Sequence, residues 1–322
     1  MKNEYEIVPY SKLRHINIFL INITYRNYHM HNEIEIFAVI KGTATIRQNN
    51  TATEIGPGSI VILNSGEAHE IDASGNSVTA IVMQLSSHFL RDYFSRIHNT
   101  RFNVTDIRQV VSDSVMLSLW KCLLSAAENY IAGEELFELH CVANTARLLS
   151  QLLTHTPNEV ISESEYLAKK KITQRMARLY SYIDENYQYP IRLADVAETE
   201  GITPTHLSHF FSEHFGISFQ QYLSNLRFEH AVRLMDDSSM SVSDIAAASG
   251  FSDLKYMTQM FMHYFGCRPK EFREHLNVDS AGQHSAAPRN LLEFYYSDEQ
   301  SLGMLSQCSA EQLTNGEALA SQ

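Results

Sequence analysis

The sequence predicts an α+β protein that joins an amino-terminal β-barrel or jelly roll to a carboxy-terminal all-α domain. Three observations carry this prediction. Short β-branched runs alternate with Gly, Asn and Pro from residue 16 to about 85. Apolar residues then recur at helical spacing between residues 87 and 155. Finally, one helical module occurs twice between residues 193 and 266.

Length and composition fit a globular protein of two domains. The 322 residues exceed one compact domain, and 44% hydrophobic with 19% charged residues is an ordinary globular composition. Residues 1–10 lack the apolar core of a signal peptide, and the apolar stretch 16–23 is too short to cross a bilayer, so a cytoplasmic chain without membrane contact is expected. The cysteines are too far apart for a zinc ribbon, so free buried thiols and no cofactor are expected; they are Cys122, Cys141, Cys267 and Cys308.

The formal net charge of −12 counts against a nucleic-acid-binding protein, which usually shows a basic surface. The distribution of the charge weakens that objection. Lys and Arg against Asp and Glu give −6 for residues 1–168, −1 for 169–278 and −5 for the rest of the chain. The acidity therefore lies mostly outside the segment that carries the repeated module.

The amino-terminal elements follow one another along the chain. Strands are expected at 34–40, 43–47 and 59–63, where β-branched residues lie between turn residues. Two helices are expected over 111–123 and 139–153, and this helical pair suits dimerisation. The single tryptophan, Trp120, is expected in the core beneath the first of these helices.

Two changes of composition divide the chain. One segment is polar, contains Pro157 and shows no period, which is typical of a linker, and a helical domain is expected to begin near Lys169. Beyond Asn277 the chain turns rich in Ser, Ala, Gln and Gly, which favours a mobile tail. The expected divisions are an amino-terminal domain at 1–155, a linker at 156–168, a helical domain at 169–278 and a tail at 279–322.

The repeated module covers residues 193–216 and, in a second copy, 242–266. Each copy has a short helix, a glycine at the turn and a second helix that opens with a capping residue. This is the plan of a helix-turn-helix unit. Because two copies lie in register, an unrelated pair of helical hairpins is the weaker interpretation. The turn glycines are Gly201 and Gly250, and the expected capping residues are Thr203 and Ser252.

In a helix-turn-helix unit the second helix enters the major groove, where each base pair displays a distinct pattern of donors and acceptors. Residues 218–236 between the units lack Pro and Gly and are expected to form one helix of about 28 Å, comparable with the ~34 Å between successive major-groove faces. Two such helices then suit one side of a duplex. The outward residues, and thus the predicted DNA contacts, are Thr205, Ser208, His209, Lys255, Thr258 and Gln259.

Residues 172–276 resemble the DNA-binding domain of the AraC/XylS family of transcription regulators. The resemblance implies base contacts at the outward positions just named, in an operator of double-stranded DNA. His209 and Gln259 stand where some members carry a guanine-reading Arg, so the operator sequence does not carry over. The stretch 250–273 is similar to the family signature, with landmarks at Phe265, Gly266, Pro269 and Arg273.

A histidine-rich pattern in the amino-terminal part has the form H-x-H-x3-E-x6-G, followed by P-x-G and a later His. It resembles the two motifs of the cupin barrel. In enzymes of that fold, three histidines and a carboxylate bind a divalent metal, whereas in sugar-responsive regulators of this architecture similar positions line an effector pocket. The residues concerned are His29, His31, Glu35 and His69.

We expect these four residues to contact an effector and assign no metal ligands, with metal ligation and a purely structural role as the alternatives. His29 and His31 are two apart on a strand and therefore share one face. Three neighbouring aromatic residues are expected to pack the barrel rather than stack on a sugar: Tyr25, Tyr28 and Phe37.

Together these features predict a DNA-binding transcription regulator, not an enzyme, that acts as a homodimer and controls an operon in response to a small molecule. The resemblance to sugar regulators implies a carbohydrate effector and activation by contact with RNA polymerase. Two alternatives stay open. One is a cupin metalloenzyme, such as a dioxygenase or isomerase, fused to a DNA-binding domain, and the other is a regulator controlled by a protein partner.

Overall fold

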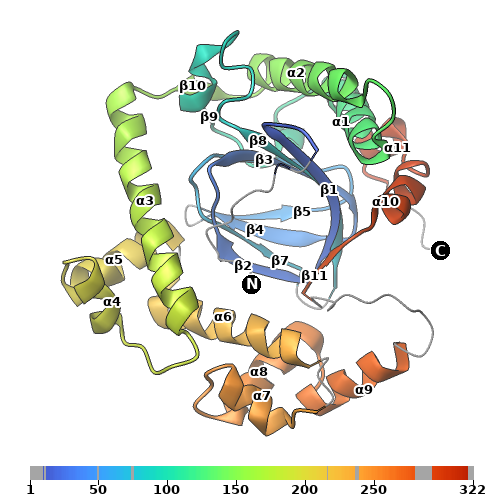
Figure 1. Cartoon of the computed structure of the whole chain (residues 1–322). Coiled ribbons are helices and arrows are strands. Elements are labelled where there is room, and N and C mark those ends of the chain that lie inside the picture. The colour runs from blue at the N-terminus through green and yellow to red at the C-terminus, as the bar shows by residue number, and fades with distance from the viewer. Residues whose placement is uncertain are drawn as a thin grey trace.

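The computed structural model describes residues 10, 12–48, 51–73, 76–215, 217–235, 239–279 and 292–317. Within them, a β-rich amino-terminal domain lies beside a helical domain, as Figure 1 shows. The predicted α+β class is confirmed. No helix in this described part of the chain is both long and apolar enough to cross a bilayer.

Two antiparallel sheets build the amino-terminal domain. The larger has the order β11-β1-β8-β3-β6 and the smaller the order β2-β7-β4-β5. No strand pairing between described residues joins the two sheets, so the domain is a two-sheet sandwich of the jelly-roll kind and not a closed barrel. The strands are β1 Ile16–Ile23, β2 Tyr25–His29, β3 Glu33–Lys41, β4 Ala44–Gln48, β5 Thr51–Ile55, β6 Ile60–Leu63, β7 His69–Asp72, β8 Val78–Ser86 and β11 Glu293–Tyr295.

The larger sheet is buried on both faces, as strand β3 illustrates. Successive side chains of a strand point to opposite faces. Ile34 and Ile36 therefore pack beneath the helices, whereas Phe37 points between the two sheets into a second apolar core. Phe37 thus packs the interior, as predicted. The apolar residues of the predicted strands at 34–40, 43–47 and 59–63 lie in β3, β4 and β6.

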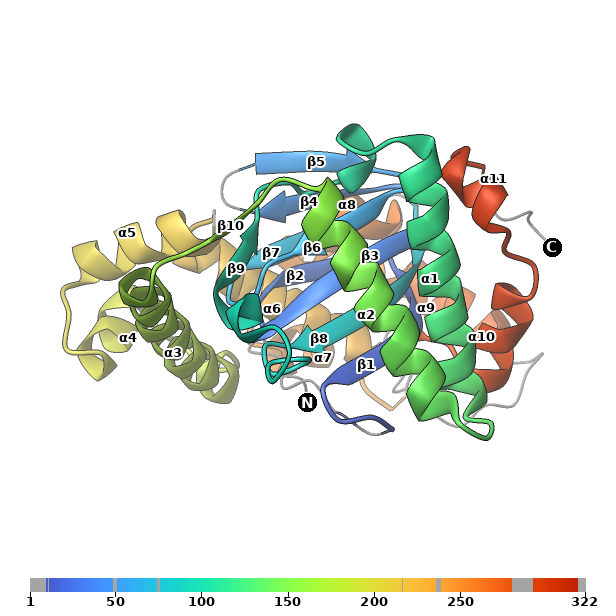
Figure 2. The same ribbon diagram turned by 90° about the horizontal axis from the view of Figure 1, so that it is seen from above.

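Helices α1 (Asp113–Ala132) and α2 (Phe137–His155) cover the outer face of the larger sheet, which Figure 2 shows from above. They confirm the predicted helical pair. Trp120 is fully buried in α1, and its Nε1 donates a hydrogen bond of 3.3 Å to the carbonyl oxygen of Gly58. The sole tryptophan is therefore part of the core, as predicted.

The predicted linker at 156–168 is largely structured. Strand β10 (Asn158–Val160) pairs with β9 (Thr100–Phe102), and helix α3 (Glu163–Asn186) begins before the expected start near Lys169. The hydroxyl of Ser162 accepts a hydrogen bond from the backbone N–H of Glu165, which caps α3. The first turns of α3 are polar and exposed, so apolar periodicity did not reveal them.

The predicted mobile tail is wrong for residues 292–317. Strand β11 extends the larger sheet at the edge of β1, and α10 (Asp298–Leu305) and α11 (Ala310–Thr314) lie against α1. Leu305 and Leu313 are buried in the core beneath the helices, which gives these short elements their stability. The rest of the predicted tail, 280–291 and 318–322, lies outside the described residues.

The helical domain contains both predicted helix-turn-helix units. In the first unit, Thr203 caps the second helix by accepting a hydrogen bond of 3.2 Å from the N–H of His206. In the second unit the cap is Asp253 and not Ser252, because this turn is one residue longer: Asp253 lies three residues after Gly250, whereas Thr203 lies two after Gly201. The helices are α4 Leu193–Thr199, α5 Pro204–Phe215, α6 Phe219–Leu234, α7 Val242–Ala248, α8 Leu254–Phe265 and α9 Pro269–Asp279.

The turn glycine of the second unit meets two demands at once. Gly250 has φ of +81°, a left-handed conformation that other residues rarely adopt. A Cβ at this position would also lie 2.6 Å from the carbonyl oxygen of Tyr187, which is too close. The repeat spacing identified this glycine for the first reason, and the approach of Tyr187 adds the second.

Strand β2 joins the two domains. Tyr28 packs into the apolar core of the first helix-turn-helix unit, and Tyr25 packs into that of the second. The expectation that these two tyrosines pack the barrel is therefore wrong. β2 is an edge strand of the smaller sheet, and helix α6 lies against it, so these side chains meet helices.

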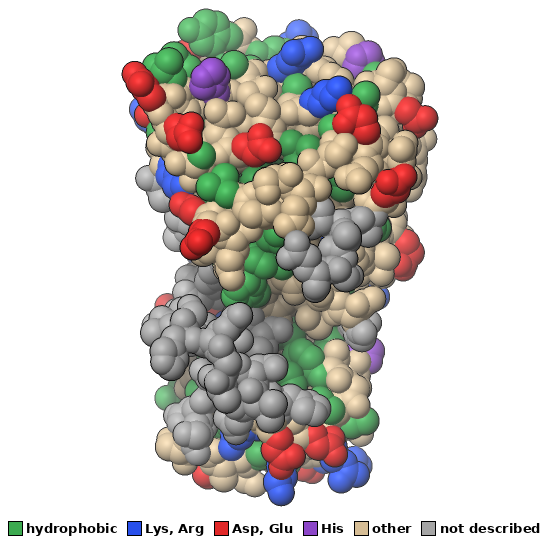
Figure 3. Space-filling view, turned by 90° about the vertical axis from the view of Figure 1, so that its right-hand side faces the viewer, with side chains coloured by type: hydrophobic (Ala, Val, Ile, Leu, Met, Phe, Trp, Pro, Cys, Tyr) green, Lys and Arg blue, Asp and Glu red, His purple; other side chains and the backbone are tan. Residues whose placement is uncertain are grey.

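The face that carries α10 and α11 is shown in Figure 3. Acidic side chains are spread over the amino-terminal domain on this face, which agrees with the negative charge counted for this part of the sequence. A polyanion such as DNA is repelled by such a surface. A nucleic-acid interface is therefore expected on the helical domain.

Candidate functional site

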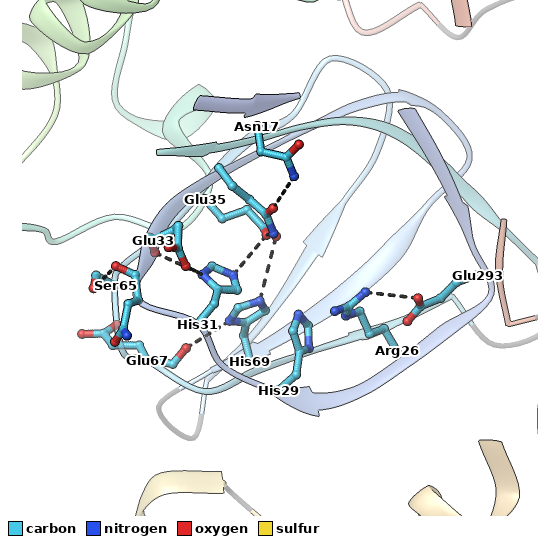
Figure 4. Close-up of polar contacts among 12 residues, drawn as sticks. Asn17, Arg26, His29, His31, Glu33, Glu35, Ser65, Glu67, His69 and Glu293 are labelled. Atoms are coloured by element: carbon cyan, nitrogen blue, oxygen red, sulfur yellow. Dashed lines mark hydrogen bonds and ion pairs between the residues drawn. The ribbon is translucent and has the colours of Figure 1, made fainter. Parts of the chain in front are cut away.

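Three buried histidines form a cluster at one end of the amino-terminal domain, as Figure 4 shows. His29 ends β2, His31 follows it, and His69 opens β7. Their rings lie 4.2 Å (His29 to His69), 5.3 Å (His31 to His69) and 6.1 Å (His29 to His31) apart between centroids. One nitrogen from each lies within 4.8 Å of the others. The structure thus brings together the three histidines that the motif predicted.

Each histidine is oriented by a backbone carbonyl. The Nδ1 atoms lie 2.9, 3.2 and 3.0 Å from the carbonyl oxygens of Asn27, Glu33 and Glu67, in the order His29, His31 and His69. A carbonyl oxygen only accepts, so Nδ1 carries the hydrogen in each ring. This leaves Nε2 to face the cluster, the arrangement that positions an imidazole as a metal ligand.

Glu35 completes the cluster from strand β3. Its carboxylate oxygens lie 3.1 Å from Nε2 of His31 and 3.9 Å from Nε2 of His69. Burial by itself raises the pKa of Glu35, but His31, His69 and a hydrogen bond from Gln84 outweigh it and lower the pKa to about 2. Glu35 is therefore ionised at neutral pH.

A ladder of polar side chains holds Glu35 in place across three strands. Gln84 on β8 lies opposite both Glu35 and Asn17, and its amide donates to Glu35 over 2.9 Å while accepting from Asn17 over 2.9 Å. The hydroxyl of Tyr130 on α1 donates to Asn17 over 3.3 Å. These partners fix the carboxylate in one orientation, and the sequence motif did not reveal them.

Two imidazoles of the cluster, those of His29 and His69, resist protonation. Burial lowers the pKa of His69 to about 4 although Glu35 opposes the shift. Burial, reinforced by Arg26 and the neighbouring histidines, also lowers the pKa of His29 well below its usual value. The ionised carboxylate of Glu35, with the two imidazoles of His29 and His69 neutral, creates a place where positive charge is stabilised.

The residues fit a divalent metal ion, which enzymes of the cupin fold bind with similar residues. Three imidazoles with inward nitrogens and one carboxylate are ligand types that suit first-row transition ions. The four side chains are at most 5% exposed, so an ion reaches them more readily than a sugar ring does. The metal interpretation, kept as an alternative on sequence grounds, therefore gains a physical basis.

The predicted DNA contacts lie on the outer faces of α5 and α8. Opposite them, the inward residues Leu207, Phe211, Met257 and Phe261 are fully buried. One of the six predicted contacts is half-buried: the hydroxyl of Thr258 donates to the carbonyl oxygen of Leu254 over 2.9 Å. The other five, Thr205, Ser208, His209, Lys255 and Gln259, are exposed.

A groove of about 800 Å³ lies between α6 and α8. Gln259, one of the predicted DNA contacts, lines it together with Asn225 and Tyr264. Both of these residues also contact Tyr25 of the amino-terminal domain. The amide of Asn225 donates a hydrogen bond of 2.7 Å to the hydroxyl of Tyr25, and the rings of Tyr264 and Tyr25 lie 4.5 Å apart between centroids. The groove therefore runs from a predicted DNA contact to the interface between the domains.

Asn27 connects this interface to the histidine cluster. Its carbonyl oxygen orients His29, its backbone N–H donates to Glu229 over 3.2 Å, and its side-chain oxygen accepts from Asn225 over 3.1 Å. Glu229 and Asn225 both lie on α6, between the two helix-turn-helix units. Such contacts join residues some 200 positions apart, which no local pattern in the sequence reveals.

Comparison with known proteins supports both predicted domains. Residues 18–140 match a family model described as the AraC-like ligand binding domain, and residues 196–275 match one described as a helix-turn-helix domain. The resemblance to AraC-type regulators is thus confirmed at the level of both domains.

Similar proteins carry regulator names. An uncharacterized HTH-type transcriptional regulator of Staphylococcus aureus is 26% identical over 255 residues, which are 79% of this chain and 33% of that protein. The chain thus spans one third of the length of this relative. The regulator ExsA of Pseudomonas aeruginosa is 22% identical over 79% of this chain and 90% of its own. The structure of Vibrio cholerae ToxT with a bound unsaturated fatty acid covers 82% of this chain and 96% of its own at 15% identity, with a TM-score of 0.43.

Proposed function

We propose that this chain, which combines an AraC-like ligand-binding domain with a helix-turn-helix domain, is a transcription regulator that binds DNA in response to a small molecule. The observation that carries the proposal is the pair of exposed recognition helices α5 and α8 on either side of α6. The regulator names of the relatives support it. A homodimer, contact with RNA polymerase and activation of an operon remain predictions.

DNA recognition is assigned to the outer faces of α5 and α8. Lys255 and Gln259 are exposed one helical turn apart on α8, where both can face a duplex. Lys binds guanine edges or phosphates, and Gln pairs with adenine in the major groove. Each good base contact contributes roughly 1 to 3 kcal/mol of discrimination between base pairs.

The experiment measures binding of the full chain to the DNA upstream of its own gene by fluorescence anisotropy. Affinity is expected to fall steeply with salt because phosphate contacts release counterions. Gln259→Ala is expected to change which operator variants bind best. Lys121→Ala, which alters an exposed residue on α1, is the control and leaves binding unchanged. Binding that does not respond to salt, or no binding at all, would overturn the proposal.

The histidine cluster is assigned to sensing. His29, His31, Glu35 and His69 remain the proposed effector contacts, and their burial makes a divalent ion the ligand that fits best at this point. A bound ion would supply the positive charge that balances the ionised carboxylate of Glu35. A sugar ring needs more open space than these residues offer.

Cobalt titration tests the cluster. After chelator treatment, the full chain is expected to take up one equivalent of Co²⁺ with a ligand-field absorption band. His31→Ala is expected to abolish the band, whereas His88→Ala, an exposed histidine outside the cluster, preserves it. If the treated protein takes up no cobalt and no zinc, the four residues are structural and the ion assignment is wrong.

Two features bear on the remaining interpretations. The outer side of α2 exposes Leu139 and Val142, and Leu136 at its N-cap is also exposed. Because α1 is covered by α10 and α11, the proposed homodimer would use α2. A metal-loaded cluster is also what the fused cupin metalloenzyme would carry. Turnover by the cobalt- or iron-loaded chain with candidate dioxygenase or isomerase substrates would favour that alternative, and effector-dependent DNA binding without turnover favours the regulator.

A further inference from the structure

A second cavity, of about 360 Å³, lies between helix α3 and the rim of the amino-terminal domain. We call it the α3 cleft. One wall is formed by Tyr166, Lys170 and Thr173, which are spaced four and three residues apart and therefore share one face of α3. The other wall is formed by rim residues that include Glu33 and Arg101. The cleft thus lies between the helix that leads into the DNA-binding units and the domain that holds the histidine cluster.

Helix α3 lies close to the rim at two points. A Cβ at Gly66, whose φ is +70°, would lie 2.8 Å from the hydroxyl oxygen of Thr173. Only glycine therefore lets this turn of the rim meet α3 here. Nearer the amino-terminal end of α3, the ring of Tyr166 packs edge-on against that of His98, with 5.0 Å between the ring centroids, and both residues line the cleft.

The lining of the α3 cleft consists of hydrogen-bonding groups. Hydroxyl, amide and imidazole side chains from the rim dominate one wall, and a hydroxyl and an ammonium from α3 face them. Such a surface matches a ligand that carries several hydroxyl groups. The volume is at the low end of the range for small-molecule sites, about 300 to 1,000 Å³, so the ligand is of monosaccharide size.

The charged groups of the α3 cleft differ in their partners. The guanidinium of Arg101 lies 3.2 Å from the carboxylate of Glu67, and the carboxylate of Glu33 accepts a hydrogen bond of 2.9 Å from the hydroxyl of Tyr10. Lys170 has no ion-pair partner among the residues that the structure describes. The ammonium of Lys170 on the α3 wall is therefore available to a ligand anion, whereas the Glu33 carboxylate lies on the opposite wall. A charge-assisted bond to this ammonium is stronger than a neutral one.

From these observations we infer that the α3 cleft binds the organic effector, and that this effector is a small hydroxylated anion such as a sugar acid or a sugar phosphate. This inference rests on the proposed function and names the chemistry of its effector. Lys170 binds the acidic group, and the rim hydroxyls and amides bind the ligand's hydroxyl groups.

Occupancy of the α3 cleft reaches both functional parts of the molecule. Glu33 lines the cleft, and its backbone carbonyl orients His31, so the organic ligand and the cluster are neighbours. A ligand that contacts α3 and the rim at once stabilises the arrangement in which the two are close. The DNA-binding units move with α3, and the ligand thereby shifts the population of their orientations.

Calorimetric titration of the full chain tests the inference with defined probes. D-glucuronate, D-gluconate and D-glucose 6-phosphate are titrated in parallel, and neutral D-glucose serves as the matched control. At least one of the three anions is expected to bind ten times more tightly than D-glucose. The carboxylate and phosphate arms show which acidic group the site prefers. If no anion binds better than D-glucose, the inference is overturned.

Two lysines on the same helix locate the site. Lys170→Gln is expected to weaken the preferred anion at least tenfold, whereas Lys171→Gln, an exposed neighbour that does not line the cleft, leaves it unchanged. Equal affinity in Lys170→Gln and in the unchanged chain would place the ligand elsewhere. Anisotropy with promoter DNA is measured on the same samples without ligand. Intact DNA binding with no anion response contradicts only the cleft assignment, whereas absent DNA binding contradicts the proposed function.

Discussion

The two helix-turn-helix units share a sequence pattern and differ in how they meet the amino-terminal domain. The first unit takes Tyr28 and Met30 of that domain into its apolar core. The second takes Tyr25, whose ring lies 4.5 Å from that of Tyr264 and whose hydroxyl accepts a hydrogen bond from Asn225. Apolar contact has no direction, whereas hydrogen bonds fix one geometry. The second unit is therefore attached in a defined orientation, and the first is held mainly by burial.

The difference assigns separate roles to the two units. Because Asn27 links the histidine cluster to α6 beside the second unit, we expect a change in the cluster to reach that unit first. The groove between α6 and α8 carries the same contacts toward Gln259. On the proposed function, we expect the DNA contacts of the second unit to respond to ligand, and those of the first unit to depend less on it.

The largest effect is expected from removing a core aromatic of either unit. Phe211 and Phe261 are both fully buried, so replacing either with alanine is expected to lower the free energy of unfolding by about 3 to 5 kcal/mol in urea denaturation. Phe261→Ala should also loosen strand β2 in hydrogen exchange, because Phe261 supports Phe228 and through it Tyr264. Met262→Ala, an exposed control on α8, stays within about 0.5 kcal/mol. Equal loosening near Tyr25 by Phe211→Ala would contradict the separate attachments.

A smaller effect is expected from the polar attachment of the second unit. Asn225 is buried, and Asn225→Ala leaves the hydroxyl of Tyr25 and the side-chain oxygen of Asn27 without this donor. The free energy of unfolding is expected to fall by roughly 1 to 3 kcal/mol. Ligand-dependent DNA binding should weaken more than ligand-free binding. Gln220→Ala, exposed on the same helix, is the control. An unchanged ligand response would mean that coupling does not pass through this contact.

The smallest predicted effect depends on pH and involves Glu229. Burial raises the pKa of this carboxyl to about 7, Glu293 adds to the shift, and Arg233 and Arg26 oppose it. The folded state therefore holds the proton more tightly than the unfolded state. The resulting stabilisation is complete below the usual pKa of 4.5 and is lost as pH rises through about 7. Between pH 6 and 8 the free energy of unfolding should fall by about 1 kcal/mol.

Glu229→Gln provides the control for this pH dependence. The amide cannot ionise, so the difference between pH 6 and 8 that comes from this site should disappear in denaturation curves. If the variant keeps the full pH dependence of the unchanged chain, another group is responsible and Glu229 does not titrate in this range.

Sequence patterns predicted the parts of this molecule that depend on local order. Alternation located β3, β4 and β6, and the repeat located both recognition helices with their turn glycines. The histidine motif correctly predicted that His29, His31 and His69 lie close together. Whether they bind an effector or an ion depends on their burial and on the carbonyls that orient them, which the spacing does not encode.

The features that escaped prediction depend on distant partners. The segment 292–317 has a weakly apolar composition. It is ordered because β11 pairs with the edge of β1 and Leu313 packs in the core beneath α1. The contacts of Tyr25 and Asn27 with α6 cross 198 to 202 positions of sequence. The α3 cleft likewise exists only once the two domains meet. Periodicity describes an element by itself and does not identify its neighbour.

The return of the chain to the first sheet through β11 makes the helical domain an insertion. Polypeptide leaves the amino-terminal domain at α3 and re-enters it at Leu292, whose carbonyl oxygen accepts hydrogen bonds from Thr24 and Tyr25. A domain tethered at two points does not swing freely as one on a single linker does. It pivots about the axis through its two anchors, and each anchor keeps the other's contacts at high effective concentration. If the proposed ligand moves this domain, we expect a hinge rotation about these two anchors.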